Sequence, residues 1–231
     1  MIRFHARWPR LGILALLVSA CLAAPAGGQA TPGENLEVRE ILLENGMRIL
    51  ILPREGAPTV SFTVRFGLGG VHERLGTTGI AHLLEHMLFK GTTTIGTRDP
   101  EAEQRLFPLM DAAHDSLLLA RVRDDRAEKE RLVARVDALE DSARAFVESN
   151  EFDRILSRAG AQGLNATTTN EATIYFVELP SNRTELWFAL EADRMSNPVF
   201  REYYSERDVV TEERRMRIES VPGGVLYETH L

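Results

Sequence analysis

The most constraining feature of this sequence is the run His82-Leu83-Leu84-Glu85-His86, in which three residues separate two histidines. Residues four apart lie on one face of an α-helix. A helix here would therefore hold both imidazoles about 6 Å apart, within reach of one metal ion. Glu85 follows His82 by three residues and shares that face. The spacing predicts a helix that directs two nitrogen ligands and a carboxylate toward one point.

Imidazole nitrogen is a common zinc ligand, and H-x-x-E-H is the reverse of the H-E-x-x-H zinc motif. Glu85 would lie beside the metal, where it can accept a proton from water whose pKa the metal lowers to ~7. The alternative is a pair of core histidines without a metal. Burying three such groups without a use is costly, which disfavours that alternative. The apolar neighbours that predict a buried helix are Ile80, Leu83, Leu84, Met87 and Leu88.

A catalytic zinc site needs a third protein ligand, and the segment Tyr204–Glu219 is the best source of one. Its strong helix formers, with acidic residues early and arginines late, favour a helix. Glu206 and Glu213 return to within about 20° of each other after two helical turns. Glu212 points elsewhere and fits a solvated surface. The spacing alone leaves open whether Glu213 is a ligand or a surface residue.

Three segments, in this order, resemble the pitrilysin/insulinase family of zinc endopeptidases, especially its bacterial processing-peptidase-like branch. They are His82–Gly91, Gly163–Phe176 and Glu206–Glu219. The resemblance implies zinc as cofactor, a peptide as substrate and a mitochondrial-processing-peptidase-like metallohydrolase fold. The roles that it implies are metal ligands for His82, His86 and Glu213, general base for Glu85, site support for Glu206, and substrate binding along an edge strand for Asn165 and Ala166.

One departure from the family pattern is the distance between the second histidine and the distal glutamate. His86 and Glu213 are 127 positions apart, farther than the family usually places them. Residues 100–149 supply the surplus and predict a helical insertion, either a helical hairpin or one bent helix with a polar break at residues 123–126. Its charges are expected to form a solvated surface. Apolar residues recur there at helical spacing: Leu118, Val122, Leu132, Val136, Leu139, Ala143 and Phe146.

The remaining sequence predicts strands and helices that do not alternate strictly. Strands are expected at residues 38–43, 47–52, 59–66 and 173–178, and a helix at residues 184–195. Asn45-Gly46 between two apolar runs is typical of a hairpin turn. This order favours an α+β fold, an antiparallel sheet with helices packed on one face, over a doubly wound parallel sheet.

Residues 1–30 have the layout of a secretory signal peptide and cleavage region. Arginines precede an apolar run, Leu11–Ala20, that is too short to span a membrane. Cleavage before Thr31 would release a soluble protein, whereas cleavage before Cys21 would leave a cysteine that carries a lipid. Both alternatives predict export, either to the periplasm or beyond it. Cys21 is the only cysteine, so no internal disulfide can form.

Residues 31–231 are long enough for one domain with a substantial core, expected to be an N-terminal zinc peptidase domain. Members of the resembled family continue into a second domain of similar fold, which is expected to be absent from this chain and to be its partner. A formal net charge of −7 argues against a nucleic-acid binder. His72, His114 and His230 lack ligand-spaced neighbours and are expected at the surface or in loops.

Two function classes fit these observations. The first is a zinc endopeptidase domain that hydrolyses extended peptides or unfolded segments, with Glu85 as general base. The second is a non-catalytic binding or assembly subunit of the same fold, inactive without a partner domain. Such subunits have lost a ligand or the base. His82, Glu85, His86 and Glu213 are all present, which favours the enzyme.

Overall fold

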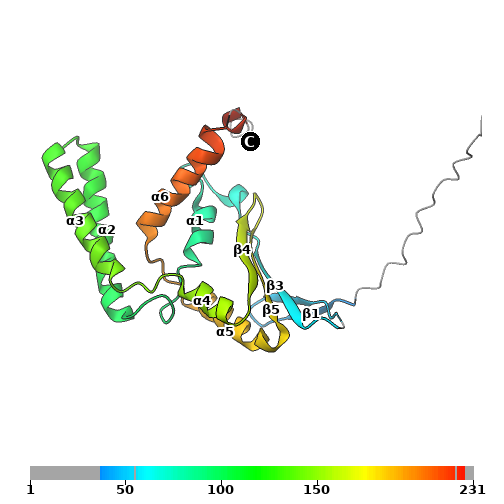
Figure 1. Ribbon diagram of the computed structural model, residues 1–231. Coiled ribbons are helices and arrows are strands. Elements are labelled where there is room, and N and C mark those ends of the chain that lie inside the picture. The colour runs from blue at the N-terminus through cyan, green and yellow to red at the C-terminus, as the bar shows by residue number, and fades with distance from the viewer. Residues whose placement is uncertain (1–36, 55, 222, 227–231) are drawn as a thin grey trace, which may run out of the picture. The chain divides into compact units, whose positions relative to one another are not determined.

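The computed structural model describes residues 37–54, 56–221 and 223–226 (Figure 1). These residues belong to two units, one ending at residue 55 and one beginning at residue 56. The expected signal peptide, its cleavage sites, Cys21 and His230 lie outside the described residues. Among the helices in the described ranges, none is long and apolar enough to cross a membrane.

The first unit contains an antiparallel hairpin of β1 (Arg39–Leu42) and β2 (Arg48–Ile51). Gly46 in its turn has φ +84°, a conformation that glycine adopts without steric cost. The side-chain oxygen of Asn45 accepts a hydrogen bond from the backbone N–H of Met47 at 3.0 Å. The predicted hairpin is confirmed, with both strands one residue shorter at each end.

The second unit is built on a three-stranded antiparallel sheet in the order β3–β5–β4. β3 (Thr59–Phe66) pairs with β5 (Thr173–Pro180) over its whole length, and β4 (Gln162–Thr168) pairs with the other side of β5. Strand β4 is therefore an edge of this sheet. Alternate residues of β5 are buried: Thr173, Tyr175, Val177 and Leu179. This period of two is that of a sheet with one covered face.

Helices cover that face of the sheet, as Figure 1 shows for α1, α4 and α5. These elements are α1 (Ile80–Met87), α4 (Glu151–Arg158) and α5 (Thr184–Ser196). The core between sheet and helices consists of Phe62, Val177, Leu179, Phe152, Leu156, Trp187 and Leu190. The predicted α+β fold, an antiparallel sheet with helices on one face, is confirmed.

The sheet and its helices are accompanied by short turns and followed by one further helix. Helix α6 (Tyr203–Arg214) follows α5 and continues into a π-helical segment, Arg215–Glu219. Single 3₁₀ turns are at Gly70–His72 and Ser181–Arg183. Helices α1 and α6 lie side by side, which brings the histidine motif next to the acidic segment (Figure 1).

The expected helical insertion is a hairpin of α2 (Pro100–Val122) and α3 (Arg126–Arg144), the first of the two alternatives. Each helix begins at an aspartate whose carboxylate accepts a backbone hydrogen bond, Asp99 from Ala102 and Asp125 from Glu128. These caps fix where each helix starts. The chain turns between the helices at the predicted polar break.

The hairpin has a hydrophobic core of its own. Its buried members are Met110, Ala113, Leu117 and Ala120 from α2, and Leu132, Val136, Leu139 and Ala143 from α3. Leu118 and Val122 belong to the apolar residues that recur at helical spacing in the sequence, but they are 59% and 78% exposed. Leucines occupy three consecutive positions of α2, 117 to 119. The apolar pattern alone therefore does not decide which face of the helix is buried.

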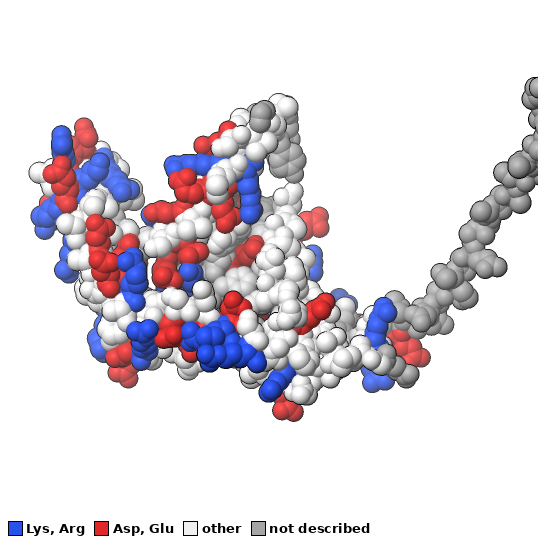
Figure 2. Space-filling view, viewed as in Figure 1, with Lys and Arg blue, Asp and Glu red and all other residues white. Residues whose placement is uncertain are grey.

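Charged side chains on α3 pair with one another along the helix. The pairs are Arg126 with Glu130, Arg131 with Glu128, and Arg144 with Asp141. Figure 2 shows both charge signs interspersed over the hairpin. Exposed pairs of this kind contribute little to stability, because solvent screens their charges. They form the solvated surface that the composition indicates.

Candidate metal centre

A carboxylate caps helix α1 and so fixes the position of the histidine motif. Glu73 accepts hydrogen bonds from the backbone N–H groups of Gly79 at 2.7 Å and Ala81 at 2.8 Å. These groups would otherwise lack partners at the helix start, where a negative charge is also favourable. Gly79 has φ +94°, which few other residues adopt, and lets the chain turn into the helix.

Helix α1 packs one side into the core and leaves the other facing α6. Ala81, Leu83 and Met87 are buried, whereas His82, Glu85 and His86 are half-buried. Ile80, which the apolar pattern places in the buried group, is the first residue of the helix and is 52% exposed. The polar residues of the motif therefore share one accessible face, as the spacing predicts.

Helix α6 brings Glu213 to the two histidines. The Nε2 atoms of His82 and His86 lie 3.3 Å apart. Oxygens of Glu213 lie 3.7 Å from Nε2 of His82 and 3.9 Å from Nε2 of His86. Two nitrogens bound at ~2.05 Å to a tetrahedral ion are about 3.3–3.4 Å apart. The histidines thus have the spacing of ligands, and the carboxylate needs to approach only slightly.

These three side chains fit a divalent cation. Their ligand atoms all lie within 4.8 Å of one another. Glu213 Oε2 is buried and accepts no hydrogen bond, so its negative charge depends on ion pairs for compensation. The guanidinium of Arg217 lies 3.1 Å from it as an ion pair. A cation between the carboxylate and the imidazoles would satisfy this oxygen, and two imidazoles with one carboxylate are a donor set suited to zinc.

The neighbouring glutamates do not face this point. Glu212 is 61% exposed and pairs with Arg215, and Glu219 is 51% exposed and pairs with Arg214. The geometry therefore favours Glu213 over Glu212 as the third ligand. Its role as a ligand stays a prediction.

Glu206 lies on the opposite side of the His86 ring. Its Oε2 atom is 3.2 Å from Nδ1 of His86, so both ring nitrogens of His86 have neighbours. An outer carboxylate of this kind fixes the orientation and tautomer of a metal-binding histidine. Burial raises the pKa of Glu206, but the hydrogen bond and charge of Lys90, followed by those of His86, outweigh it and lower that pKa. Glu206 is thus an anionic acceptor at neutral pH.

The protonation of His82 also suits a ligand. Burial, followed by the neighbouring His86, lowers the pKa of His82 from its usual 6.5, although Glu85 and Glu213 oppose the shift. The imidazole is consequently neutral at pH 7, with a lone pair available on one nitrogen. A neutral imidazole is the form that binds metals.

Glu85 faces the end of the edge strand β4. The hydroxyl of Thr168, the last residue of β4, donates a hydrogen bond to Oε2 of Glu85 at 2.5 Å. This contact orients the carboxylate beside the two histidines. The same hydroxyl lies 3.3 Å from that of Thr173 on β5.

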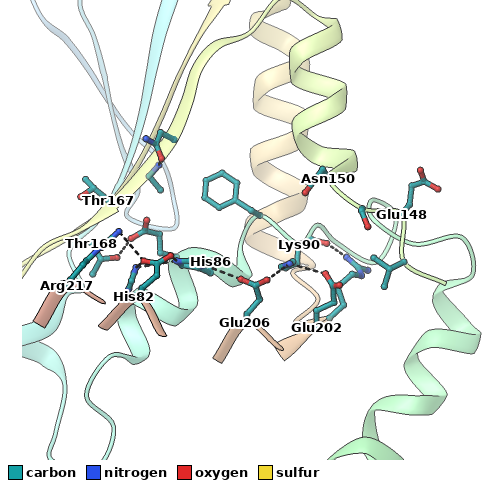
Figure 3. Close-up of a pocket in the computed structure, with 18 residues that line it drawn as sticks. His82, His86, Lys90, Glu148, Asn150, Thr167, Thr168, Glu202, Glu206 and Arg217 are labelled. Atoms are coloured by element: carbon teal, nitrogen blue, oxygen red, sulfur yellow. Dashed lines mark hydrogen bonds and ion pairs between the residues drawn. The ribbon is translucent and has the colours of Figure 1, made fainter. Parts of the chain in front are cut away.

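The site opens into a cleft of about 870 Å³ (Figure 3). Helices α1 and α6 line one part of the cleft, and Asn165, Ala166, Thr167 and Thr168 of β4 line another. Asn165 and Ala166 thus lie on an edge strand beside the candidate site, as expected. Their role in binding substrate stays a prediction.

Sequence reasoning missed several residues that shape this site. Lys90 and Thr168 lie inside the segments that resemble the family, so their place in the sequence could have indicated a role in the site. No pattern in the sequence indicated Glu73.

His114, expected at the surface, has a side chain that is only 14% exposed. It lies 3.0 Å from Glu140 and stacks on Tyr204 of α6 at 3.3 Å between ring centroids. A histidine without ligand spacing can still be buried when its polar atoms find partners.

Fold and site together define an α+β domain with a candidate metal centre in a cleft beside an edge strand. The family model for insulinase (peptidase family M16) matches residues 48–104 and 139–228, more than half of the sequence. The chain therefore belongs to the insulinase family. The residues between the two matched segments, 105–138, fall within the α2–α3 hairpin.

Similar proteins carry peptidase names. The chain is 25% identical over 190 residues to zinc protease PqqE of Helicobacter pylori, covering 81% of this chain and 31% of that protein. It is 26% identical over 193 residues to the uncharacterized zinc protease YmxG of Bacillus subtilis, covering 83% and 34%. A crystal structure of a protease from Helicobacter pylori matches with a TM-score of 0.57 and 25% identity, covering 82% and 34%. The chain spans about a third of the length of these relatives.

Proposed function

We propose that this chain is a zinc endopeptidase domain that hydrolyses peptides bound in extended form. The observation that carries the proposal is the meeting of His82, His86 and Glu213, with Glu85 on the same face. Its zinc would be held by those three residues, leaving one coordination position open. When bound, zinc would polarise the scissile carbonyl and lower the pKa of a water molecule.

Glu85 would act as general base and then as general acid. One of its carboxylate oxygens accepts a proton from the attacking water while the water oxygen forms a bond to the carbonyl carbon. The same proton then passes to the amide nitrogen as the C–N bond breaks, which releases an amine and a carboxylic acid, and the acid then loses its own proton to solvent. Thr168 holds Oε2 of Glu85 during these transfers, which leaves Oε1 for the water. His82 and His86 would keep their lone pairs on the metal throughout.

Strand β4 would bind the substrate backbone. Only one side of β4 pairs within the three-stranded sheet, so its other side is an open edge, where the N–H of Ala166 donates to the side-chain oxygen of Asn165 at 2.8 Å, a contact that a bound peptide would replace. An extended peptide can add to such an edge by main-chain hydrogen bonds. Asn165 and Ala166 lie three and two residues before Thr168, whose hydroxyl contacts Glu85. A peptide paired with this part of β4 would therefore run past Glu85. The site would thus recognise the extended backbone of a peptide more than the identity of its side chains.

The alternative is a non-catalytic subunit that binds peptides, and one observation supports it. The chain covers about a third of each relative's length, so a second peptidase-like domain or subunit would be needed to complete the cleft. The same sequence would then bind peptides without cleaving them. Retention of all three candidate ligands and of Glu85 in one cleft favours the enzyme.

The function is tested by incubating the purified chain with a quenched fluorescent peptide, alone and with a candidate second domain. Cleavage that stops with a zinc chelator and returns on zinc addition supports the endopeptidase. Tight peptide binding, zinc at full occupancy and no cleavage in either mixture would support the binding subunit.

We also propose that the protein is exported from the cytoplasm. Residues 1–30 would direct it to the periplasm or beyond, with release before Thr31 or lipid attachment at Cys21. The mass of the mature N-terminal peptide from cells distinguishes the two, and an intact N-terminus beginning at Met1 would contradict both.

A further inference from the structure

We propose that Lys90 is a positioning residue that holds Glu206 against His86 and thereby sets the His86 nitrogen that faces the metal. The proposal rests on the metal site proposed above. Lys90 lies just beyond the end of α1, and its Nζ atom is 2.6 Å from Oε1 of Glu206. The other oxygen of that carboxylate lies 3.2 Å from Nδ1 of His86. Figure 3 shows this series of contacts from Lys90 through Glu206 to the ring.

The orientation of His86 depends on this series. A histidine whose Nδ1–H donates to a carboxylate has its lone pair on Nε2. In His86 that atom is the one 3.3 Å from Nε2 of His82 and 3.9 Å from Glu213. Lys90 occupies the second oxygen of Glu206, which limits rotation of the carboxylate away from the ring. Losing the lysine would leave Glu206, with a side chain only 15% exposed, without its cation.

A second carboxylate holds Lys90 in place. Glu202 Oε2 lies 3.0 Å from Nζ of Lys90. Glu202 precedes α6 with φ +58°, a left-handed conformation that is uncommon outside glycine. This backbone conformation brings its side chain back toward the C-terminal end of α1. One ammonium group thus bridges two glutamates of one helix terminus, a task for a compact cation with three donors.

The backbone of Lys90 is fixed as well. Its carbonyl oxygen accepts a hydrogen bond from Arg201, which is 1% exposed and also bonds the carbonyls of Thr92 at 2.7 Å and Ile95 at 3.1 Å. A Cβ atom at Gly91 or Gly96 would come within 3.0 Å or less of that guanidinium. Arg201 therefore holds the loop after α1 in one conformation, and Lys90 starts from a fixed point.

The test compares Lys90→Met with Lys90→Arg and with Lys129→Met. Lys129 is the only other lysine in the sequence, and it is exposed on α3. We expect Lys90→Met to lower zinc affinity about 10- to 100-fold in a competition titration, as loss of outer-shell partners does. Lys90→Arg keeps a cation and should restore part of the affinity, because the planar guanidinium replaces the charge but not the compact shape of the ammonium group. Lys129→Met should match the wild type.

An ion pair that only stabilises the fold would not change which ring nitrogen of His86 carries the proton. We therefore measure the nitrogen chemical shifts of His86 in the zinc-free chain by NMR. The wild type should show a proton on Nδ1, and Lys90→Met should show a mixture of both tautomers. Should Lys90→Met not fold, Lys90→Gln takes its place with the same expectations.

The outcomes separate this proposal from the proposed function. Wild-type affinity and an unchanged His86 tautomer in the folded Lys90 variant would overturn the role of Lys90, whatever the activity of the chain. If the wild type binds no zinc, the metal site itself is wrong, and the tautomer measurement alone decides whether Lys90 orients the ring.

Discussion

The carboxylate of Glu213 lies 3.9 Å from Nε2 of His86, although the whole α2–α3 hairpin separates the two residues in the sequence. Their proximity depends on the packing of α1 against α6 and not on the length of the chain between them. An insertion between two packed elements adds loop length at little cost in free energy. The unusual spacing of the motif is thus compatible with the ligand arrangement that the family pattern implies.

Replacing Glu85 by Gln should remove turnover while keeping the fold and the metal. The amide is nearly isosteric but cannot accept a proton from water. We expect peptide cleavage to fall by at least ~10²-fold, the lower range for loss of general-base catalysis, with zinc content unchanged. Metal analysis and a cleavage assay on the same preparation measure both quantities. Loss of zinc in this variant, or normal cleavage, would contradict the assigned role.

Arg201→Met should destabilise the chain strongly. Arg201 and Glu103 are both 1% exposed and form a hydrogen-bonded ion pair at 2.9 Å. Removing one partner leaves the other charge buried without compensation, which costs about 3–5 kcal/mol. The free energy of unfolding in urea measures the effect.

Arg98→Met is the matched control for that variant. Arg98 pairs with Glu148 at 3.0 Å with a side chain that is 65% exposed, and an exposed pair contributes little to stability, so we expect a much smaller loss than in Arg201→Met. Equal losses of stability in the two variants would show that burial of the Arg201 pair has no special cost.

Trimming the distal part of the hairpin should leave zinc binding intact. Replacing residues 113–136 with a short glycine-serine linker removes most of the hairpin core but keeps Glu103, which pairs with Arg201. The candidate ligands lie on α1 and α6, outside the deleted stretch. We expect unchanged zinc stoichiometry and a lower unfolding midpoint. A trimmed chain that folds but holds no zinc would place a ligand or a necessary support inside the hairpin.

Zinc binding should weaken only in mildly acidic solution. The pKa of His82 lies below its usual 6.5, chiefly because of burial, so protons compete for this nitrogen only as the pH falls below that value. Affinity should therefore be nearly constant from pH 8 to pH 7 and decrease at lower pH. Competition titrations across this range measure it. A steady loss of affinity between pH 8 and pH 7 would mean that the histidine pKa is raised instead.

Much of this architecture follows from local patterns in the sequence. The hairpin at Asn45-Gly46, the strands β3 and β5 and the face shared by His82, Glu85 and His86 all follow from turn chemistry and from periods of 2 and 3.6 residues. The choice of Glu213 over Glu212 needed tertiary packing, because helical spacing alone does not say which face meets α1.

Other contacts had no local signal. Glu73 caps α1 from a loop, and Arg201 reaches carbonyls more than a hundred positions away in the sequence. The first contact depends on the path of a short loop and the second on how distant segments pack, and periodicity encodes neither. Leu118 shows the same limit within one helix, since three adjacent leucines left the buried face ambiguous.

The most direct test of the central claim is the zinc content of Glu213→Ala beside that of Glu212→Ala. The two glutamates are adjacent on one helix, but one faces the histidines and the other is exposed and paired with Arg215. The account predicts one zinc per chain in the wild type and in Glu212→Ala, and a sharp loss in Glu213→Ala. Full zinc retention in Glu213→Ala would contradict the assignment of Glu213 as the third ligand.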